Sequence, residues 1–204
     1  MNSNYFSTPP VVKNLIIINC LVALAVMLIE PVNHLAAKYG ALYWFSSPYY
    51  HSYQFVTYMF IHAGWDHLFF NMFALWMFGR ELEYTLGSKR FLTYYIICGI
   101  GAALVQMAVA GLTGEYYIQL VGASGAVMGL LLAFGVLWPN SVIMLIFPPI
   151  PLKAKWFVII YAVIELLLGA TGREPGVAHF AHIGGMLWGW ALLYYWRKKG
   201  IIRY

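Results

Sequence analysis

Charged residues are scarce in this sequence. Asp, Glu, Lys and Arg together make up 9% of its 204 residues, whereas soluble domains contain about 25%. Hydrophobic residues make up 62%. A water-soluble fold of this size could not bury so much apolar surface, so the composition excludes an ordinary soluble domain and indicates an integral membrane protein.

The alternation of polar and apolar residues that marks membrane β-barrel strands is also missing. Apolar residues form long, uninterrupted stretches, and in lipid such stretches are stable as helices because helices satisfy their own backbone polar groups. We therefore predict an all-α, polytopic membrane protein. Six stretches approach the roughly 20 residues that cross a bilayer core: 12–32, 66–84, 90–111, 122–139, 153–170 and 178–197.

Cysteine is nearly absent. Cys20 and Cys98 each lie within an apolar stretch, so we interpret them as packing residues rather than a disulfide or a metal-binding pair. The H-E-x-x-H motif of zinc proteases is absent, and we found no internal repeat. The missing zinc motif argues against a catalytic metal.

The net charge of +5 would by itself permit nucleic-acid binding, but the cations cluster at the ends of apolar stretches. There they are better explained as topology signals, because Lys and Arg stay in the cytoplasm. We expect both termini to be cytoplasmic and no nucleic-acid partner. With this orientation ten cations lie inside and two, Lys38 and Arg173, outside; the inside set is Lys13, Arg80, Lys89, Arg90, Lys153, Lys155, Arg197, Lys198, Lys199 and Arg203.

The longest connection, 33–63, is expected on the outside. It is rich in Tyr, Trp and Phe, and aromatic rings favour the headgroup zone, so we predict that it lies in the membrane interface; an ordinary long loop remains the alternative. The first apolar stretch lacks a small-residue cleavage site, so we expect a retained anchor helix. The whole chain, 1–204, is predicted to form one membrane domain.

A hydroxyl and an imidazole occur beside glycines in two of the predicted spans. Ser124 lies in Gly-Ala-Ser-Gly at the start of 122–139, and His182 lies in Ala-His-Ile-Gly-Gly near the start of 178–197. Both spans run from outside to inside, so the two side chains are expected at similar depth. They could act as nucleophile and general base. Close packing through glycines alone remains an alternative.

A possible third member of a triad is harder to place. Glu165 is expected deep in 153–170, where it more plausibly pairs with another polar group, so we predict a Ser–His dyad. His67 and Asn71 share one helix face, and both can donate hydrogen bonds. Together with the Ser124 backbone N–H, they could form an oxyanion hole. Ordinary interhelical hydrogen bonding is the alternative. The other histidines, His34, His51, His62 and His179, are expected to be structural.

Taken together, these motifs resemble the rhomboid family of intramembrane serine proteases. The similarity includes Gly122–Gly125 as G-x-S-G, His182 with Gly185 and Gly189 as A-H-x-x-G-x-x-x-G, and His62, His67 and Asn71 as H-x₄-H-x₃-N; the stretches 54–62 and 79–83 are also similar. The resemblance covers essentially the whole chain in the family's minimal six-helix form.

The resemblance implies an activity and a location. Rhomboids cleave transmembrane segments of other membrane proteins near the outer face, without metal or cofactor. Ser124 would be the nucleophile, His182 the base, and His67 and Asn71 the oxyanion-stabilising residues. Expected partners are membrane lipid and single-pass or polytopic substrates, and the expected location is a bacterial inner membrane. A catalytically inert, client-binding member is the alternative; a transporter, suggested by Glu165, is disfavoured because no inverted repeat is present.

The sequence departs from the family pattern in two places. Many members carry Tyr four residues after the nucleophile, where this sequence has Met128; a thioether can still pack against an imidazole, so we expect the His182 ring to be held in a looser orientation. Some members carry Trp-Arg in the first loop, where this sequence has Tyr53-Gln54. That departure concerns a contact between the loop and lipid rather than the chemistry.

Overall fold

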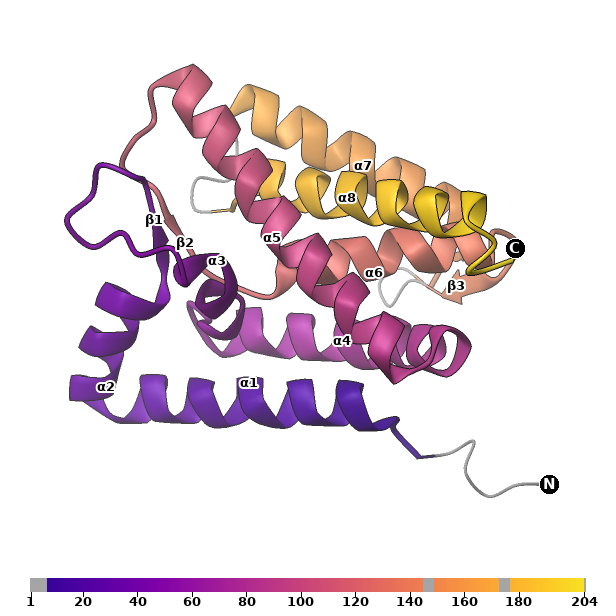
Figure 1. Ribbon diagram of the computed structural model, residues 1–204, viewed down its shortest axis with the longest axis horizontal. Helices are drawn as coiled ribbons and strands as arrows, with labels where there is room; N and C mark the ends of the chain where they lie inside the picture. Colours follow the sequence, from indigo (N-terminus) through magenta and orange to yellow (C-terminus); the bar gives the residue numbers. More distant parts are fainter. Residues whose placement is uncertain (1–6, 145–148, 173–176, 204) are drawn as a thin grey trace.

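Six long helices make up the body of the part of the chain that the structure describes (Figure 1). The computed structural model describes residues 7–144, 149–172 and 177–203. The helices are α1 (Pro10–Leu28), α4 (Trp65–Leu86), α5 (Ser88–Thr113), α6 (Ser124–Leu137), α7 (Ala154–Thr171) and α8 (His179–Lys198). The predicted all-α bundle is confirmed. Arg173, predicted to be outside, lies beyond the described residues.

Five of the six predicted spans agree with these helices to within two residues at each end, but the first was placed too long. It was expected to continue to residue 32, whereas α1 ends at Leu28 and a separate helix, α2 (Glu30–Leu35), follows. Pro31 in the first turn of α2 is the reason, because proline is accommodated at a helix start and not in a helix interior.

The predicted loop 33–63 is folded. After α2 it contains a π-helical turn (Ala36–Gly40), strand β1 (Leu42–Tyr43), helix α3 (Gln54–Thr57) and a 3₁₀ turn (Tyr58–Phe60). β1 pairs antiparallel with β2 (Gln119–Leu120). The buried Gln54 side chain holds the segment together, since its amide donates to the Tyr49 carbonyl at 2.8 Å and accepts from His51 N–H at 3.1 Å. Its position in a membrane interface remains a prediction.

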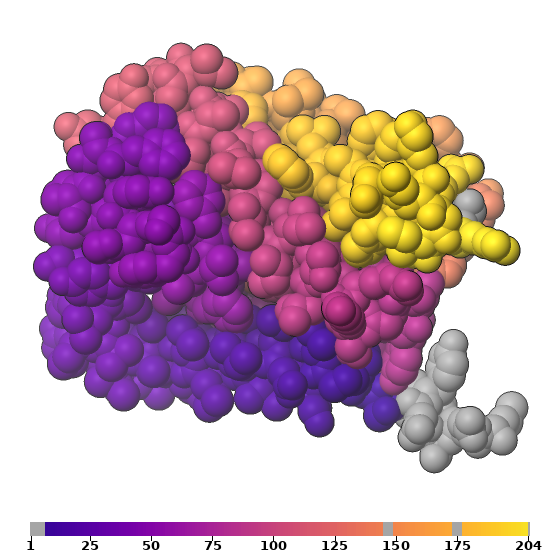
Figure 2. Space-filling view, viewed as in Figure 1, coloured from indigo at the N-terminus to yellow at the C-terminus, as the bar shows by residue number. Residues whose placement is uncertain are grey.

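The two ends of the bundle differ. At one end β1 and β2 lie beside the starts of α4, α6 and α8; at the other, β3 (Val142–Met144) pairs with β4 (Pro151–Lys153) (Figure 1). In Figure 2, α1 runs along the bottom of the molecule and the segment that follows it covers the left end. By the predicted topology, the β1–β2 end faces outward.

Helix α6 lies at the centre of the packing and contacts α4, α5, α7 and α8. Its small and branched apolar residues, including Ala126, Leu130 and Ala133, are fully buried. Helix α7 is peripheral, and its buried residues are Ala154, Val158 and Glu165. Most of its large apolar side chains, such as Ile160 and Leu167, are exposed, as expected for a helix that faces lipid.

Among the described residues, three helices are long and apolar enough to cross a membrane: α1, α5 and α7. Helix α6 is apolar but has only 14 residues. The all-α bundle and these apolar helices identify an integral membrane protein.

The end opposite β1 and β2 is stabilised by a buried carboxylate. Glu83, near the end of α4, accepts hydrogen bonds from the N–H groups of Val11 and Val12 at 3.0 and 2.8 Å, and from the Ser88 hydroxyl at 2.6 Å. These N–H groups belong to the first turn of α1, which has no intrahelical acceptors. Glu83 thus fixes the start of α1 against α4.

Candidate active site

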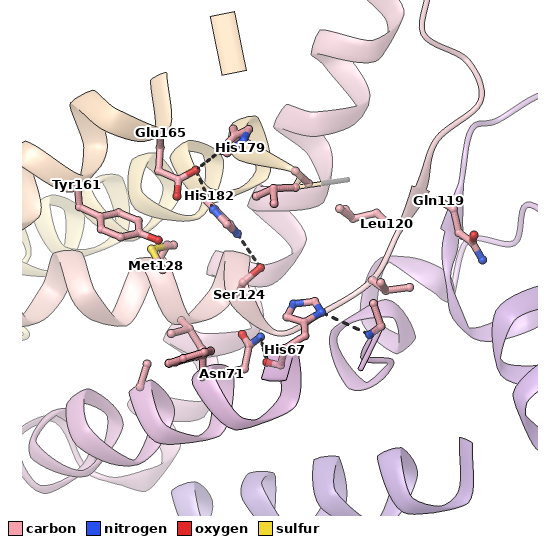
Figure 3. A pocket seen from close by; sticks show the side chains of 17 residues that line it. His67, Asn71, Gln119, Leu120, Ser124, Met128, Tyr161, Glu165, His179 and His182 are labelled. Carbon is pink, nitrogen blue, oxygen red and sulfur yellow. Dashed lines mark hydrogen bonds and ion pairs between the residues drawn. The ribbon is translucent and has the colours of Figure 1, made fainter. Parts of the chain in front are cut away.

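A cavity of about 530 Å³ opens between α4, α6, α7 and α8, at the end of the bundle that carries β1 and β2. Ser124, His182, His67 and Asn71 all line it. Figure 3 shows these side chains converging from three helices on one space. The residues that the sequence singled out therefore lie together.

Ser124 and His182 are in direct contact. Ser124 Oγ lies 2.8 Å from His182 Nε2, a normal hydrogen-bond distance. Ser124 is the first residue of α6 and His182 lies in the first turn of α8, so both are at the same end of the bundle. When the hydroxyl donates to Nε2, the proton of the neutral ring must be on Nδ1.

Glycines make this contact possible. A Cβ atom added to Gly185 would lie only 1.8 Å from the carbonyl oxygen of Gly125, and one added to Gly129 would lie 2.4 Å from Cys98 Sγ. The backbones of α6 and α8 therefore touch directly. This close approach brings His182 within reach of Ser124.

A carboxylate does lie beside His182, contrary to the prediction. Glu165 Oε2 is 2.9 Å from His182 Nδ1 and 2.7 Å from His179 Nδ1, and the Glu165 side chain also interacts with the Tyr161 hydroxyl. Figure 3 shows the carboxylate reaching from α7 to the two imidazoles of α8. The sequence could have revealed this, because Glu165 is only six residues before Thr171, the outer end of α7.

His179 was expected to be structural, and it contacts the same carboxylate oxygen. Ligand atoms of Glu165, His179 and His182 lie within 4.8 Å of one another, and all three residues are buried. Such a set could hold a metal ion. Only the His179 contact is a hydrogen bond, at 2.7 Å; His182 Nδ1 lies 2.9 Å from the same oxygen without hydrogen-bond geometry. The expectation of a metal-free site remains a prediction.

His67 and Asn71 surround Ser124 with hydrogen-bond donors. The Ala63 N–H donates to His67 Nδ1 at 3.4 Å, which leaves the proton of the neutral ring on Nε2. Asn71 Nδ2 donates to the His67 carbonyl at 2.7 Å, and its second hydrogen remains available. The Ser124 N–H, at the start of α6, has no intrahelical acceptor.

Gly122 holds the segment before α6 close to His67. Its φ angle is +111°, a conformation that strains residues with a side chain. A Cβ atom there would lie 2.7 Å from His67 Nε2. Glycine at this position therefore lets the imidazole edge lie against the backbone next to Ser124.

His62, in the loop before α4, packs edge-on against His67 with ring centroids 5.2 Å apart. Burial, with a smaller contribution from His67, lowers the pKa of His62 to about 4. His62 is therefore neutral at physiological pH. Its packing against His67 agrees with the structural role expected from the sequence.

Met128 and Tyr161 both lie on the cavity wall (Figure 3). Met128 stands one turn after Ser124 on α6, where many rhomboids carry Tyr, and Tyr161 comes from α7. The aromatic ring on this part of the cavity wall is therefore that of Tyr161 on α7, and not that of a residue on α6. The sequence alone did not indicate Tyr161.

Comparisons with known proteins decide the family. The sequence matches the family described as "Rhomboid domain" over residues 49–199. The chain belongs to the rhomboid family. It is 33% identical over 138 residues to "Rhomboid protein 1, mitochondrial" of Saccharomyces cerevisiae, covering 67% of this chain and 39% of the yeast protein.

Other rhomboid relatives come from different cellular settings. The chain is 35% identical over 151 residues to "Rhomboid protease AarA" of Providencia stuartii, covering 64% of this chain and 51% of that protein. It is 32% identical over 143 residues to "Presenilin-associated rhomboid-like protein, mitochondrial" of Bos taurus, covering 66% of this chain and 36% of that protein. This rhomboid thus spans about half or less of these relatives' length, and mitochondrial names among them leave the predicted bacterial inner membrane unsupported.

Proposed function

We propose that this rhomboid is an intramembrane serine endopeptidase that uses Ser124 as nucleophile and His182 as general base. The observation that carries this proposal is the 2.8 Å contact between Ser124 Oγ and His182 Nε2 inside a cavity lined by hydrogen-bond donors. A serine hydroxyl is a weak nucleophile until an adjacent base removes its proton, and the imidazole is positioned to do so.

In the first step, Ser124 Oγ attacks the carbonyl carbon of the scissile peptide bond while its proton passes to His182 Nε2. The carbonyl oxygen gains negative charge, and donors from His67, Asn71 and the Ser124 backbone stabilise it. The C–N bond then breaks as the imidazolium returns the proton to the leaving amine. The products of this step are a free amine and an ester on Ser124.

In the second step, a water molecule attacks the ester carbonyl and gives a proton to His182 Nε2. The C–O bond to Ser124 breaks, the serine recovers its proton, and a free carboxylic acid leaves. Because the cavity lies between helix ends rather than at the bundle centre, water can reach it from the outer side.

The substrates are transmembrane segments of other membrane proteins, cut near the outer face. If the cavity end of the bundle faces outward, both termini are cytoplasmic, because the start of α1 and the end of α8 lie at the opposite end (Figure 1). The partners are then membrane lipid and single-pass or polytopic proteins. We treat residues 1–204 as one rhomboid membrane domain.

Co-expression with a panel of tagged single-span membrane proteins tests this proposal. We expect a shortened product of at least one panel member with the wild-type chain and none with Ser124→Ala at equal abundance. A product that persists in Ser124→Ala would contradict the assignment. Client binding that survives Ser124→Ala, without any product from the wild-type chain, would instead indicate a catalytically inert rhomboid.

A further inference from the structure

The Ser–His pair does not account for the most costly feature of the site. Glu165 is 4% exposed and lies on α7, whose large apolar side chains mostly face outward. Ionisable residues within a membrane are expensive and usually serve a function. A buried charge that served only to join helices could be replaced by apolar packing at no loss of stability.

The partners of Glu165 are ionisable as well. Its Oε2 atom lies 2.9 Å from His182 Nδ1 and 2.7 Å from His179 Nδ1. The Ser124 contact uses His182 Nε2, so Glu165 and Ser124 occupy opposite nitrogens of one ring. This is the arrangement in which a carboxylate fixes the tautomer of a base and stabilises the imidazolium that forms when the base takes a proton.

We propose that Glu165 is a positioning residue for His182, so that the site works as a Ser124–His182–Glu165 relay with His179 anchoring the carboxylate. This inference rests on the proposed function and extends it. Glu165 keeps the proton of neutral His182 on Nδ1, which leaves Nε2 free to accept the Ser124 proton. Its negative charge then offsets the positive charge of the ring during attack.

The relay also ties catalysis to helix α7. The buried residues of α7 other than Glu165 are Ala154 and Val158, both in its first half. In the outer half of α7, Glu165 is buried against the histidines of α8, and Gly169 packs against Phe180 and His179, where an added Cβ would lie 3.2 Å from His179 Cβ. Any displacement of the outer half of α7 away from α8 withdraws the carboxylate from His182 and misaligns the base.

A fluorophosphonate probe gives a direct test, because it reacts with an activated serine without needing a known substrate. Ser124 Oγ forms a bond to phosphorus, the P–F bond breaks, and the serine proton leaves through His182. We would measure the maximal labelling rate and the half-saturating probe concentration from pH 5 to 9 in detergent micelles. The variants are Glu165→Gln, Glu165→Asp and His179→Phe, with Glu83→Gln as the matched buried-glutamate control.

We expect Glu165→Gln to lower the maximal labelling rate at least about tenfold, with little change in half-saturating concentration. Loss of the negative charge disfavours protonated His182, so the acid limb of the pH–rate profile moves to lower pH by about one unit. Glu165→Asp retains the charge and the position of the acid limb. Glu83→Gln leaves the acid limb in place because Glu83 lies at the other end of the bundle.

His179→Phe keeps the inference testable if Glu165→Gln does not fold. It removes the second partner of the carboxylate, whose charge then acts more strongly on His182, so the acid limb should move to higher pH. Other titratable side chains near His182 could also move the acid limb. On the cavity wall these are Glu165 and Tyr161 from α7, His179 from α8 and His67 from α4. Tyr94 and Cys98 of α5 lie further away, against Gly189, two turns along α8.

Two results would overturn the inference. One is a Glu165→Gln protein that labels at the wild-type rate; the other is a slower protein whose acid limb has not moved, because a purely structural glutamate would behave in that way. Failure of the proposed function gives a different pattern. In that case even the wild-type chain would show no labelling that depends on Ser124.

Discussion

Among the described residues two glutamates are buried, at opposite ends of the bundle, and their partners differ in kind. Glu83 accepts hydrogen bonds from two backbone N–H groups and a serine hydroxyl. Glu165 contacts two imidazoles, one of which contacts the Ser124 hydroxyl. The backbone N–H groups and the serine hydroxyl around Glu83 do not titrate near neutral pH, whereas the imidazoles around Glu165 can gain or lose a proton.

This difference separates a structural carboxylate from a chemical one. Glu83 satisfies donors that the start of α1 would otherwise leave unpaired, so its effect should appear in stability. Glu165 acts on the proton of a ring that faces a nucleophile, so its effect should appear in rate and in pH dependence. Variants at the two ends of the bundle should therefore fail in different assays.

The largest effect is expected at the cavity, from Asn71→Ala. Losing one oxyanion donor costs about 2.7–4 kcal/mol of barrier, so kcat for a cleaved panel substrate should fall about 100- to 1000-fold with little change in KM. Asn19→Ala is a matched control, because Asn19 Nδ2 bonds the Leu15 carbonyl at 2.8 Å, as Asn71 Nδ2 bonds that of His67 at 2.7 Å. An equal loss of kcat in both variants would contradict an oxyanion role for Asn71.

The next effect tests the helix contact that carries the site. In Gly185→Ala the new Cβ would meet the Gly125 carbonyl at 1.8 Å, so α6 and α8 must separate, at an expected cost of about 3 kcal/mol. Thermal unfolding in detergent should show a midpoint several degrees lower, and Ser124 labelling should fall. Gly64→Ala is the control, because its Cβ would meet no atom within 4 Å; equal midpoints for the two variants would rule out the close contact.

Glu83→Gln should have a smaller effect, confined to stability. The amide replaces one of two acceptor oxygens, and a buried donor left unpaired costs about 1–3 kcal/mol. Thermal unfolding measures this loss, while the labelling rate of the folded fraction stays at the wild-type value. Glu81→Gln, a partly exposed position paired with Arg80, should change stability by less than about 0.5 kcal/mol. A slower labelling rate in folded Glu83→Gln would contradict the claim that Glu83 affects only stability.

The smallest effect is expected from metal removal. Glu165, His179 and His182 have ligand atoms close enough for a metal ion, but the proposed chemistry needs none. A strong chelator such as 1,10-phenanthroline should leave labelling of Ser124 unchanged. Loss of labelling that added Zn²⁺ restores would instead assign the cluster to a metal.

Much of the fold and of the candidate site could be predicted from the sequence. Apolar length locates helices reliably because lipid leaves few other structures. The spacing of His67 and Asn71 places both on one face of a single helix. Ser124 and His182 were expected at equal depth because both lie near the start of helices that run in the same direction, and the structure brings them together.

The remaining features depend on how different helices rotate and pack. Helix α7 buries so few residues that its sequence gives little indication of which side faces the protein, and Glu165 was therefore left without a partner. The end of the first span was missed because it was carried past Glu30 and Pro31 to residue 32, whereas α1 ends at Leu28 and Pro31 lies in the first turn of a new helix. The folding of 33–63 depends on buried polar contacts such as those of Gln54, which carry no periodic signal.

The most direct test of the central claim is the site at which a fluorophosphonate reacts. Peptide mass mapping of the labelled wild-type protein should find a single adduct on Ser124, with none in folded Ser124→Ala and a rate at least about 100-fold lower in His182→Ala. An adduct on another residue, or no adduct on folded protein at any pH from 5 to 9, would contradict a Ser124–His182 peptidase.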